Sequence, residues 1–206
     1  MTLKQRVRRL VNRYGYDIHR NGPRVFDRQE HIFRGPIRTI LDVGANRGDI
    51  TAEFQRHFPE ARVFAFEALP SMAELLRDRF KGDARISVVE AAVTDSSGTR
   101  KFYENVVPDT SSLLPAGGDF ERFGYSAVFQ QRAVLEVKAM TLTEWTAAHG
   151  VQEIDILKLD IQGGELLALR GAERLLVESR IRYIYSEVLF QTVYEGQCVA
   201  GEIWAY

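Results

Sequence analysis

One short stretch of the chain alternates an acidic residue, an asparagine and two glycines directly after an apolar run. Its pattern is Asp42-x-Gly44-x-Asn46-x-Gly48. Glycine and asparagine tolerate the left-handed backbone of tight turns, and small side chains let a ligand come close to the main chain. Turns of this kind join a strand to a helix in α/β proteins and bind nucleotides there, so we expect a nucleotide-type ligand at residues 42–48.

A carboxylate follows this turn at the distance that a nucleotide site requires. The apolar run 63–66 ends in Glu67, 25 positions after Asp42. This is the spacing of a βαβ unit whose second strand offers a carboxylate to a ribose. Glu67 is therefore predicted to accept hydrogen bonds from ribose hydroxyls.

The residue types of the turn distinguish between nucleotide ligands. A dinucleotide requires Gly-x-Gly-x-x-Gly here, whereas this turn begins with an acidic residue and has asparagine in the middle. An acidic residue at the strand tip repels a pyrophosphate but suits a ligand with a positively charged end. S-adenosylmethionine carries a cationic sulfonium and ammonium, so we predict it as the cofactor. Its predicted contacts are Asp42, Gly44, Asn46, Gly48 and Glu67.

These residues need strands and helices to position them. Apolar runs predict strands at 37–43, 61–67, 86–89, 154–159 and 183–188. Periodic apolar residues between most of these runs predict helices, one of which carries Leu166, Leu169, Leu175 and Leu176. The alternation indicates an α/β fold with a mostly parallel, Rossmann-like sheet and helices on both faces. Residues 94–139 show no clear helical period, and an insertion of that length is usually functional or partly mobile.

Composition and charge narrow the class of protein. The chain has 206 residues, one cysteine (Cys198) and a net charge of −1. No intrachain disulfide can form and no apolar run approaches the ~20 residues of a membrane span, so we expect a cytoplasmic protein. The four histidines are scattered, and we predict no metal site, although a magnesium site formed by Asp160 and Glu187 is conceivable.

The N-terminal residues 1–35 differ from the rest of the chain. They carry nine Lys/Arg and three Asp/Glu, a net charge of +6, with apolar residues at helical spacing. We expect a basic amphipathic helix and arm at 1–35, followed by the cofactor-binding domain at 36–206. Such a helix contacts anionic lipid or a polyanionic substrate, or it packs on the domain as a cap.

Several blocks together resemble the FkbM-type methyltransferases, a branch of the class I S-adenosylmethionine-dependent enzymes. The blocks are 41–48, 64–70, 92–95, 110–113, 154–165 and 194–197, in family order. The resemblance implies methyl transfer to a hydroxyl oxygen of a sugar, glycan or secondary metabolite, and it adds Ala92 to the cofactor site. The class I fold usually closes with two further strands, which this chain lacks. We therefore expect an incomplete C-terminal end, an exposed fifth strand and a chain that is either poorly soluble or oligomeric.

Three carboxylates are candidates for orienting the acceptor or removing its proton. Asp160 ends the fourth predicted strand, next to the point where an open α/β sheet places its ligand. Glu165 follows two glycines, and Glu187 interrupts the tip of the fifth predicted strand. Asp160 is the first candidate, although Asp160 and Glu165 are also placed to cap the following helix.

Two other functions compete with O-methyl transfer to a small molecule or glycan. A nucleic-acid methyltransferase is not expected, because the chain has no Asn/Asp-Pro-Pro-Tyr/Phe motif and the body of the domain is acidic. The other alternative is a fragment or module that binds S-adenosylmethionine without turnover.

Overall fold

The computed structural model describes residues 32–117 and 127–206. The chain divides into two compact units, Met1–Arg34 and Gly35–Tyr206, and the fold below is that of the second. The predicted basic helix lies outside the described residues, so membrane contact through it stays a prediction. In the part of the chain that is described, no helix is long and apolar enough to cross a membrane.

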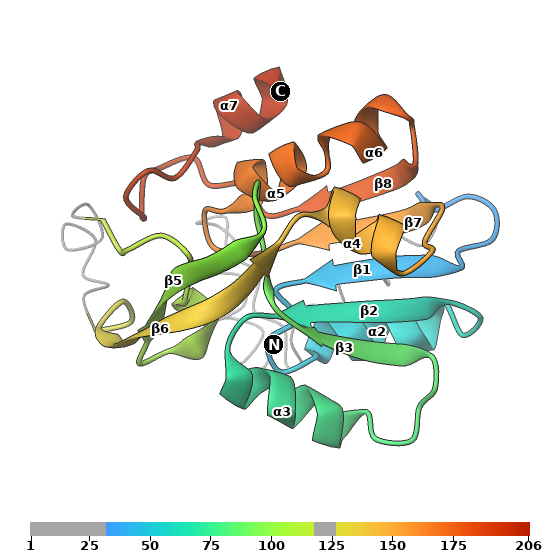
Figure 1. Cartoon of the computed structure of the whole chain (residues 1–206), viewed down its shortest axis with the longest axis horizontal. Coiled ribbons are helices and arrows are strands. Elements are labelled where there is room, and N and C mark those ends of the chain that lie inside the picture. The colour runs from blue at the N-terminus through green and yellow to red at the C-terminus, as the bar shows by residue number, and fades with distance from the viewer. Residues whose placement is uncertain (1–31, 118–126) are drawn as a thin grey trace, which may run out of the picture. The chain divides into compact units, whose positions relative to one another are not determined.

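A five-stranded parallel sheet forms the centre of the domain (Figure 1). Its strands are β1 (Thr39–Val43), β2 (Arg62–Glu67), β3 (Ile86–Glu90), β7 (Ile154–Leu159) and β8 (Ile181–Ser186). Their order is β3-β2-β1-β7-β8, and every neighbouring pair is parallel. The predicted α/β class is confirmed. Strands are added outward from β1 to β3 on one side and from β7 to β8 on the other, and folds of this kind bind ligands at the switch between β1 and β7.

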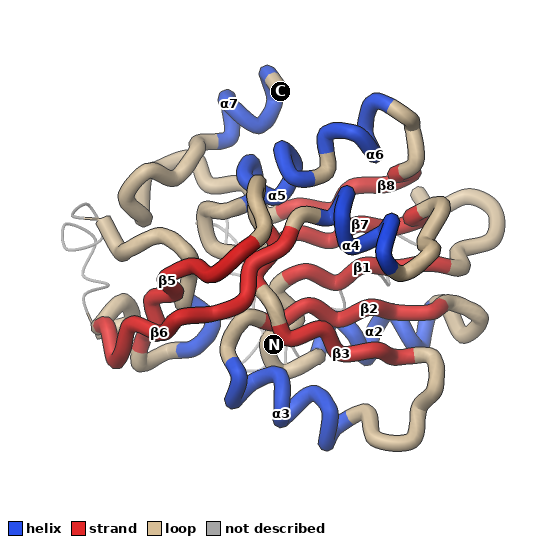
Figure 2. Tube along the Cα trace, in the orientation of Figure 1, coloured by secondary structure: helices blue, strands red, loops and turns tan. Residues whose placement is uncertain are grey.

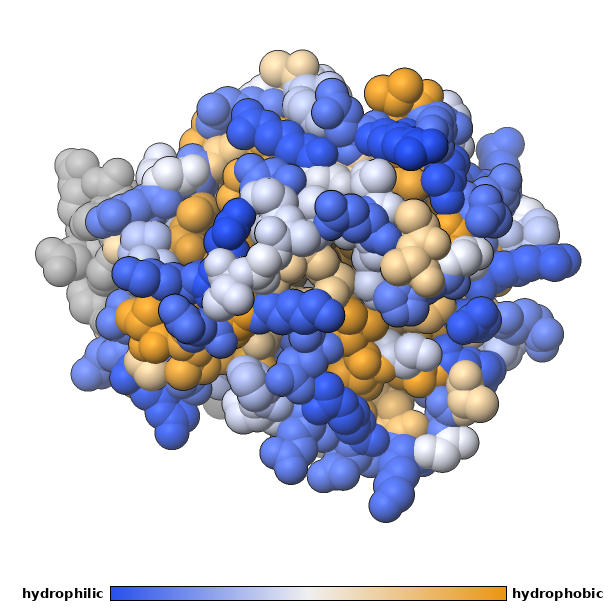
Figure 3. Space-filling model, viewed as in Figure 1, coloured by the Kyte–Doolittle hydropathy of each residue, from blue (hydrophilic) through white to orange (hydrophobic). Residues whose placement is uncertain are grey.

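Helices cover both faces of this sheet, as the sequence predicts. Phe64 and Phe66 of β2 contact the Trp145 ring at centroid distances of 4.8 and 4.9 Å. Ala65, between them on the strand, packs with Leu76 on the other face. The helices are α2 (Asp49–His57), α3 (Pro70–Arg79), α4 (Leu142–Ala148), α5 (Glu165–Gly171), α6 (Glu173–Val177) and α7 (Ala200–Ala205). Hydrophilic side chains cover most of the face shown in Figure 3, with apolar atoms in separate small areas.

The helix predicted after β7 is two helices, α5 and α6, which meet at Ala172. Gly171 lies so close to the Thr94 backbone that an added Cβ would stand 2.1 Å from the Thr94 carbonyl oxygen. The sequence-based expectation of one helix was wrong, because leucine spacing does not reveal this close approach.

The insertion at 94–139 contains strands that the sequence analysis missed. A long hairpin joins β5 (Gly98–Asn105) to β6 (Gln131–Met140), and β4 (Ala92–Val93) adds to β6 as a second sheet (Figure 2). Charged residues alternate with apolar ones along β6, and its register places Glu136 opposite Lys101. The charges hide the strand from a search for apolar runs, although alternation is itself a strand signal.

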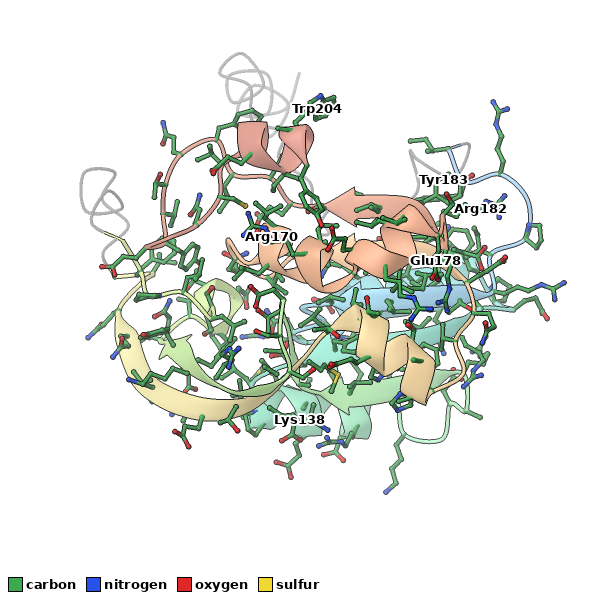
Figure 4. The ribbon with its side chains drawn as sticks, turned by 45° about the horizontal axis from the view of Figure 1, so that its top comes forward. Lys138, Arg170, Glu178, Arg182, Tyr183 and Trp204 are labelled. Atoms are coloured by element: carbon green, nitrogen blue, oxygen red, sulfur yellow. The ribbon has the colours of Figure 1, made fainter. Side chains whose placement is uncertain are left out.

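Strand β8 forms one edge of the sheet, as predicted. Several apolar side chains in and after this strand are exposed, including Ile184, Val188 and Phe190. Trp204 of α7 is 93% exposed, and its side chain is labelled in Figure 4. Exposed edges with apolar side chains favour pairing with other chains. Oligomer formation itself stays a prediction.

Candidate active site

Two adjoining chambers open at the carboxyl ends of the central strands. They share three lining residues, Gly44, Glu67 and Asp160. The first chamber is mostly apolar, and its empty volume of about 410 Å³ includes the open solvent at its mouth. Its other walls are Val43, Phe66, Ala68, Ala91, Ala92, Val93, Phe102, Leu113, Ile161 and Gly164.

The second chamber is acidic. Asp109, Asp160 and Glu187 line it together with the amides of Asn46 and Gln162. Leu69, Met72 and Pro108 complete its wall. A chamber whose oxygen atoms are mostly carboxylate accepts hydrogen bonds from hydroxyl or ammonium donors and favours positive charge.

The turn after β1 has the left-handed backbone that its residue types predict. The φ angles are +76° at Gly44, +49° at Asn46 and +81° at Gly48. A Cβ on Gly44 would lie 1.9 Å from the Asp160 carbonyl oxygen, so only glycine fits there. Gly44 and Asn46 line the chambers. Gly48 does not; it is the N-cap of α2, and a Cβ added there would lie 2.6 Å from side-chain atoms of Leu76 and Phe80.

Glu67 lies where the two chambers meet. Its Oε2 accepts a hydrogen bond from the Asn46 backbone N–H (2.8 Å), and its Oε1 accepts one from the Leu69 N–H (2.8 Å). Each carboxylate oxygen has further lone pairs, so both can accept from a ligand as well. Burial raises the pKa of Glu67, while the two backbone hydrogen bonds work against that rise. The side chain is fixed in position before any ligand binds.

Asp42 lies beneath the site rather than in it. It is fully buried, its Oδ2 accepts a hydrogen bond from Thr51 Oγ1 at 2.5 Å, and its Oδ1 lies 3.1 Å from Lys158 Nζ. Lys158 also donates to the carbonyl oxygens of Val43 (3.3 Å) and Gly44 (2.7 Å). The predicted contact between Asp42 and the cofactor is not supported by this placement. Asp42 and Lys158 instead hold the turn at the end of β1.

Asp160 and Glu187, both candidates from the sequence, lie together in the acidic chamber. One amide nitrogen joins them: Gln162 Nε2 donates to Asp160 Oδ1 (3.0 Å) and to Glu187 Oε2 (3.1 Å). Asp160 Oδ2 lies 3.7 Å from Lys158 Nζ. The two carboxylates therefore form one cluster between the ends of β7 and β8.

Glu165, the third carboxylate candidate, lines neither chamber. It is 2% exposed, and its Oε1 accepts a hydrogen bond from the Ile161 backbone N–H at 2.9 Å. It is the first residue of α5, where a carboxylate interacts favourably with the helix dipole. The alternative that the sequence left open, a structural role at the helix start, fits the geometry better than catalysis.

The chamber changes the acidity of Glu187. Partial burial, then the charges of Asp160 and Glu165, raise the pKa of Glu187 from 4.5 to about 7, while Lys158 opposes the rise. The residue is still reached by solvent through the open chamber. A carboxylate with a pKa near 7 is suited to accept a proton at neutral pH.

Two residues of the acidic chamber, Gln162 and Asp109, were not among the site residues predicted from the sequence. Asp109 lies in the insertion at 94–139, and its Oδ1 accepts a hydrogen bond from Asn46 Nδ2 at 2.8 Å. Only the three-dimensional placement of the insertion could have indicated it. For Gln162, the adjacent pair of glycines was the available signal, because it marks an unusual turn after β7. Within 32–117 and 127–206, no group of three or more His, Cys, Asp or Glu side chains could hold a metal ion.

Comparison with known proteins gives a family match over most of the chain. Residues 42–206 match the sequence model of the methyltransferase FkbM domain. The chain is 26% identical to 2-O-methyltransferase NoeI of Sinorhizobium fredii over 201 residues, 96% of this chain and 81% of that protein. It is 27% identical to 31-O-demethyl-FK506 methyltransferase FkbM of Streptomyces tacrolimicus over 176 residues, 74% of this chain and 66% of that protein.

One solved structure extends the comparison. The crystal structure of methyltransferase FkbM from Methylobacillus flagellatus is 17% identical, with a TM-score of 0.47, over 73% of this chain and 33% of that chain. The chain thus spans about two thirds of the Streptomyces relative and one third of the solved protein.

Proposed function

The chain belongs to the FkbM family of methyltransferases, and from this premise we propose that it transfers the methyl group of S-adenosylmethionine to a hydroxyl oxygen. The acceptor class that we propose is a sugar, a glycan or a secondary metabolite. One observation carries the proposal: a fixed carboxylate, Glu67, lies where an apolar chamber meets an acidic one.

The two chambers fit the parts of S-adenosylmethionine. Phe66, Ala92 and Leu113 offer apolar walls for a flat, uncharged ring, and Glu67 offers free lone pairs to ribose hydroxyls. The acidic chamber favours the positively charged end of the ligand. The Asn46 Oδ1 atom is buried without a hydrogen-bond partner among the described residues, as expected of a group that awaits a ligand. When bound, S-adenosylmethionine supplies an electrophilic methyl group.

The acidic chamber also supplies the proton acceptor that the reaction needs. An alcohol is a weak nucleophile at neutral pH, and a positioned base contributes roughly 10²–10⁴-fold to the rate. We propose Glu187 as this base, because its pKa of about 7 matches the task. It would take the hydroxyl proton as the acceptor oxygen bonds to the methyl carbon and the methyl–sulfur bond breaks, leaving S-adenosylhomocysteine, and would then release the proton to solvent. Asp160, whose Oδ2 lies near Lys158, instead orients the acceptor.

The names of two relatives support oxygen as the acceptor atom. NoeI is named a 2-O-methyltransferase, and the Streptomyces FkbM is named for a 31-O-demethyl substrate. Neither name identifies the acceptor of this chain. The identity of the acceptor depends on residues around the acidic chamber. Assays with a panel of sugar and polyketide alcohols would identify the acceptor.

Replacement of Glu67 by alanine tests the cofactor assignment. We expect the affinity for S-adenosylmethionine to fall by ~1.5–3 kcal/mol for each charge-assisted hydrogen bond lost, about 10- to 160-fold. Isothermal titration calorimetry of wild type and Glu67→Ala measures this, with NAD titrated in parallel.

Glu90→Ala is the matched control for that experiment. Glu90 occupies the position next to Glu67 on the neighbouring strand, but it is exposed and pairs with Arg77 at 2.7 Å. Its removal should leave the affinity unchanged. Tight NAD binding, or equal affinities for wild type and Glu67→Ala, would contradict the proposed cofactor. Binding without methyl transfer to any acceptor would indicate a module without turnover.

A further inference from the structure

We propose that Gln162 is a positioning residue whose amide clamps Asp160 and Glu187 and leaves one Glu187 oxygen free to receive the acceptor proton. We call this arrangement the Gln162 clamp. This inference deepens the proposed function, and it rests on that function for the role of Glu187 as the base. The clamp itself can be tested without turnover.

The geometry of the clamp begins with one amide nitrogen and two carboxylates. Gln162 Nε2 lies 3.0 Å from Asp160 Oδ1 and 3.1 Å from Glu187 Oε2. An amide NH₂ group has two hydrogens, so it can donate one to each carboxylate. Glu187 Oε1 has no hydrogen-bond partner in residues 32–117 and 127–206. That atom is therefore the oxygen available to the acceptor hydroxyl.

Contacts behind the amide fix which way it points. Tyr194 Oη lies 2.8 Å from Gln162 Oε1 and 2.9 Å from the Thr110 carbonyl oxygen, and Tyr194 is only 1% exposed. Ionised carboxylates only accept hydrogen bonds, so the NH₂ group faces them and Oε1 faces the Tyr194 hydroxyl. Ser112 Oγ also donates to the Gln162 carbonyl oxygen at 2.8 Å. Both the side chain and the backbone of Gln162 are thus held by other segments.

The backbone at this point is strained in a way that the clamp explains. Gln162 has a φ of +55° and the next residue, Gly163, has a φ of +92°. A left-handed conformation costs a non-glycine residue roughly 1–2 kcal/mol. Glycine would avoid that cost, yet the position carries a glutamine whose side chain makes three hydrogen bonds in the site. Strain kept at a ligand chamber points to a function for the side chain.

Several ionisable groups surround Glu187, and the neutral amide of Gln162 donates the hydrogen bond that Glu187 Oε2 accepts. Asp160 and Glu165 disfavour the charged form of Glu187, and Lys158 favours it. The phenols of Tyr185 and Tyr194 also lie within electrostatic reach of Glu187. Hydrogen bonds donated to a carboxylate stabilise its charged form. The amide therefore bridges two carboxylates that would otherwise repel each other.

Two substitutions remove the clamp in different ways. Gln162→Glu keeps the side-chain length but replaces the donor by a third carboxylate, so the midpoint of the Glu187 titration should rise by about one pH unit or more. Gln162→Gly removes the side chain and suits the left-handed backbone, which protects the fold. It should raise the midpoint by a smaller amount. The measurement is a carbon-13 NMR titration of the side-chain carboxyls, in which Glu187→Gln identifies the Glu187 signal.

Gln152→Glu is the matched control, because it adds the same charge on an exposed residue far from the chamber. Its Glu187 midpoint should equal that of wild type. An unchanged midpoint in both Gln162 variants, with S-adenosylmethionine affinity retained as evidence of folding, overturns the clamp. If the midpoint moves but Glu187→Gln keeps full methyl transfer, the clamp stands and the proposed base is wrong. If Glu187→Gln is inactive and the midpoint does not move, the proposed base stands and the clamp is wrong.

Discussion

Replacement of Glu187 by glutamine should lower kcat roughly 10²–10⁴-fold, because the acceptor hydroxyl loses its proton acceptor. The substitution keeps the shape of the side chain, so the affinity for S-adenosylmethionine should change little. Turnover is measured as S-adenosylhomocysteine release, with the best acceptor from a panel of sugars and polyketide alcohols. Retention of more than about a tenth of the activity would rule out Glu187 as the main base.

The pH profile gives this prediction a second, independent readout. Since the pKa of Glu187 is raised to about 7, the wild-type rate should fall about tenfold per pH unit below that value as the base becomes protonated. The profile of Glu187→Gln should lack this acidic limb. Glu195→Gln is the control, because Glu195 is an exposed carboxylate in the segment after β8 that lines neither chamber. Its rate and profile should match those of wild type.

The same carboxylate should also affect stability. A carboxyl whose pKa is raised from 4.5 to about 7 on folding contributes stability that is fully present below 4.5 and lost as the pH rises through 7. Glu187→Gln does not ionise, so its Tm should exceed that of wild type at pH 8 and equal it near pH 4. A higher Tm in an inactive variant is the behaviour expected where a site holds a destabilised group for function.

The sequence predicted the sheet well because its parallel strands are buried and therefore almost continuously apolar. The strands β1, β2 and β7 each consist mainly of Val, Ile, Leu, Phe and Ala, and nearly all of their residues are buried. The hairpin of β5 and β6 has one face in solvent and carries many charges, so the same search failed there. Apolar runs indicate strands covered on both faces, whereas alternation is needed for the others.

The site was predicted in part, and its errors have a common cause. From the spacing along the chain, we correctly expected Glu67, Asp160 and Glu187 to lie at the carboxyl ends of the parallel strands. It could not show which carboxylates face the chamber and which face the protein interior. Asp42 and Glu165 are both buried and bonded to protein groups, a distinction that depends on side-chain direction. Gln162 lies in the block that resembles the family, but it was not a site candidate because the search considered ionisable groups.

The largest expected loss of stability comes from Lys158, which is 3% exposed and holds the fully buried Asp42. The two residues face each other on the adjacent strands β1 and β7. Lys158→Met leaves the Asp42 charge without its cation, and breaking a buried pair in this way costs about 3–5 kcal/mol. Because domains of this kind are stable by only about 5–15 kcal/mol, the variant should be close to unfolding. Urea unfolding followed by circular dichroism measures the change in the free energy of unfolding.

The double variant Asp42→Asn, Lys158→Met separates the lost charge balance from lost packing. It removes both charges and keeps an acceptor for Thr51 Oγ1, so it should be clearly more stable than Lys158→Met alone. Lys138→Met, an exposed strand lysine labelled in Figure 4, is the matched control and should cost less than about 0.5 kcal/mol.

Burial lowers the pKa of Lys158, but the charges of Asp42 and Asp160 more than offset this and the pKa is raised. The stabilisation is therefore fully present at neutral pH and is lost only as the pH rises above the ordinary lysine range. If Lys158→Met were as stable as Lys138→Met at pH 7, the buried pair would not be what holds the turn at the end of β1.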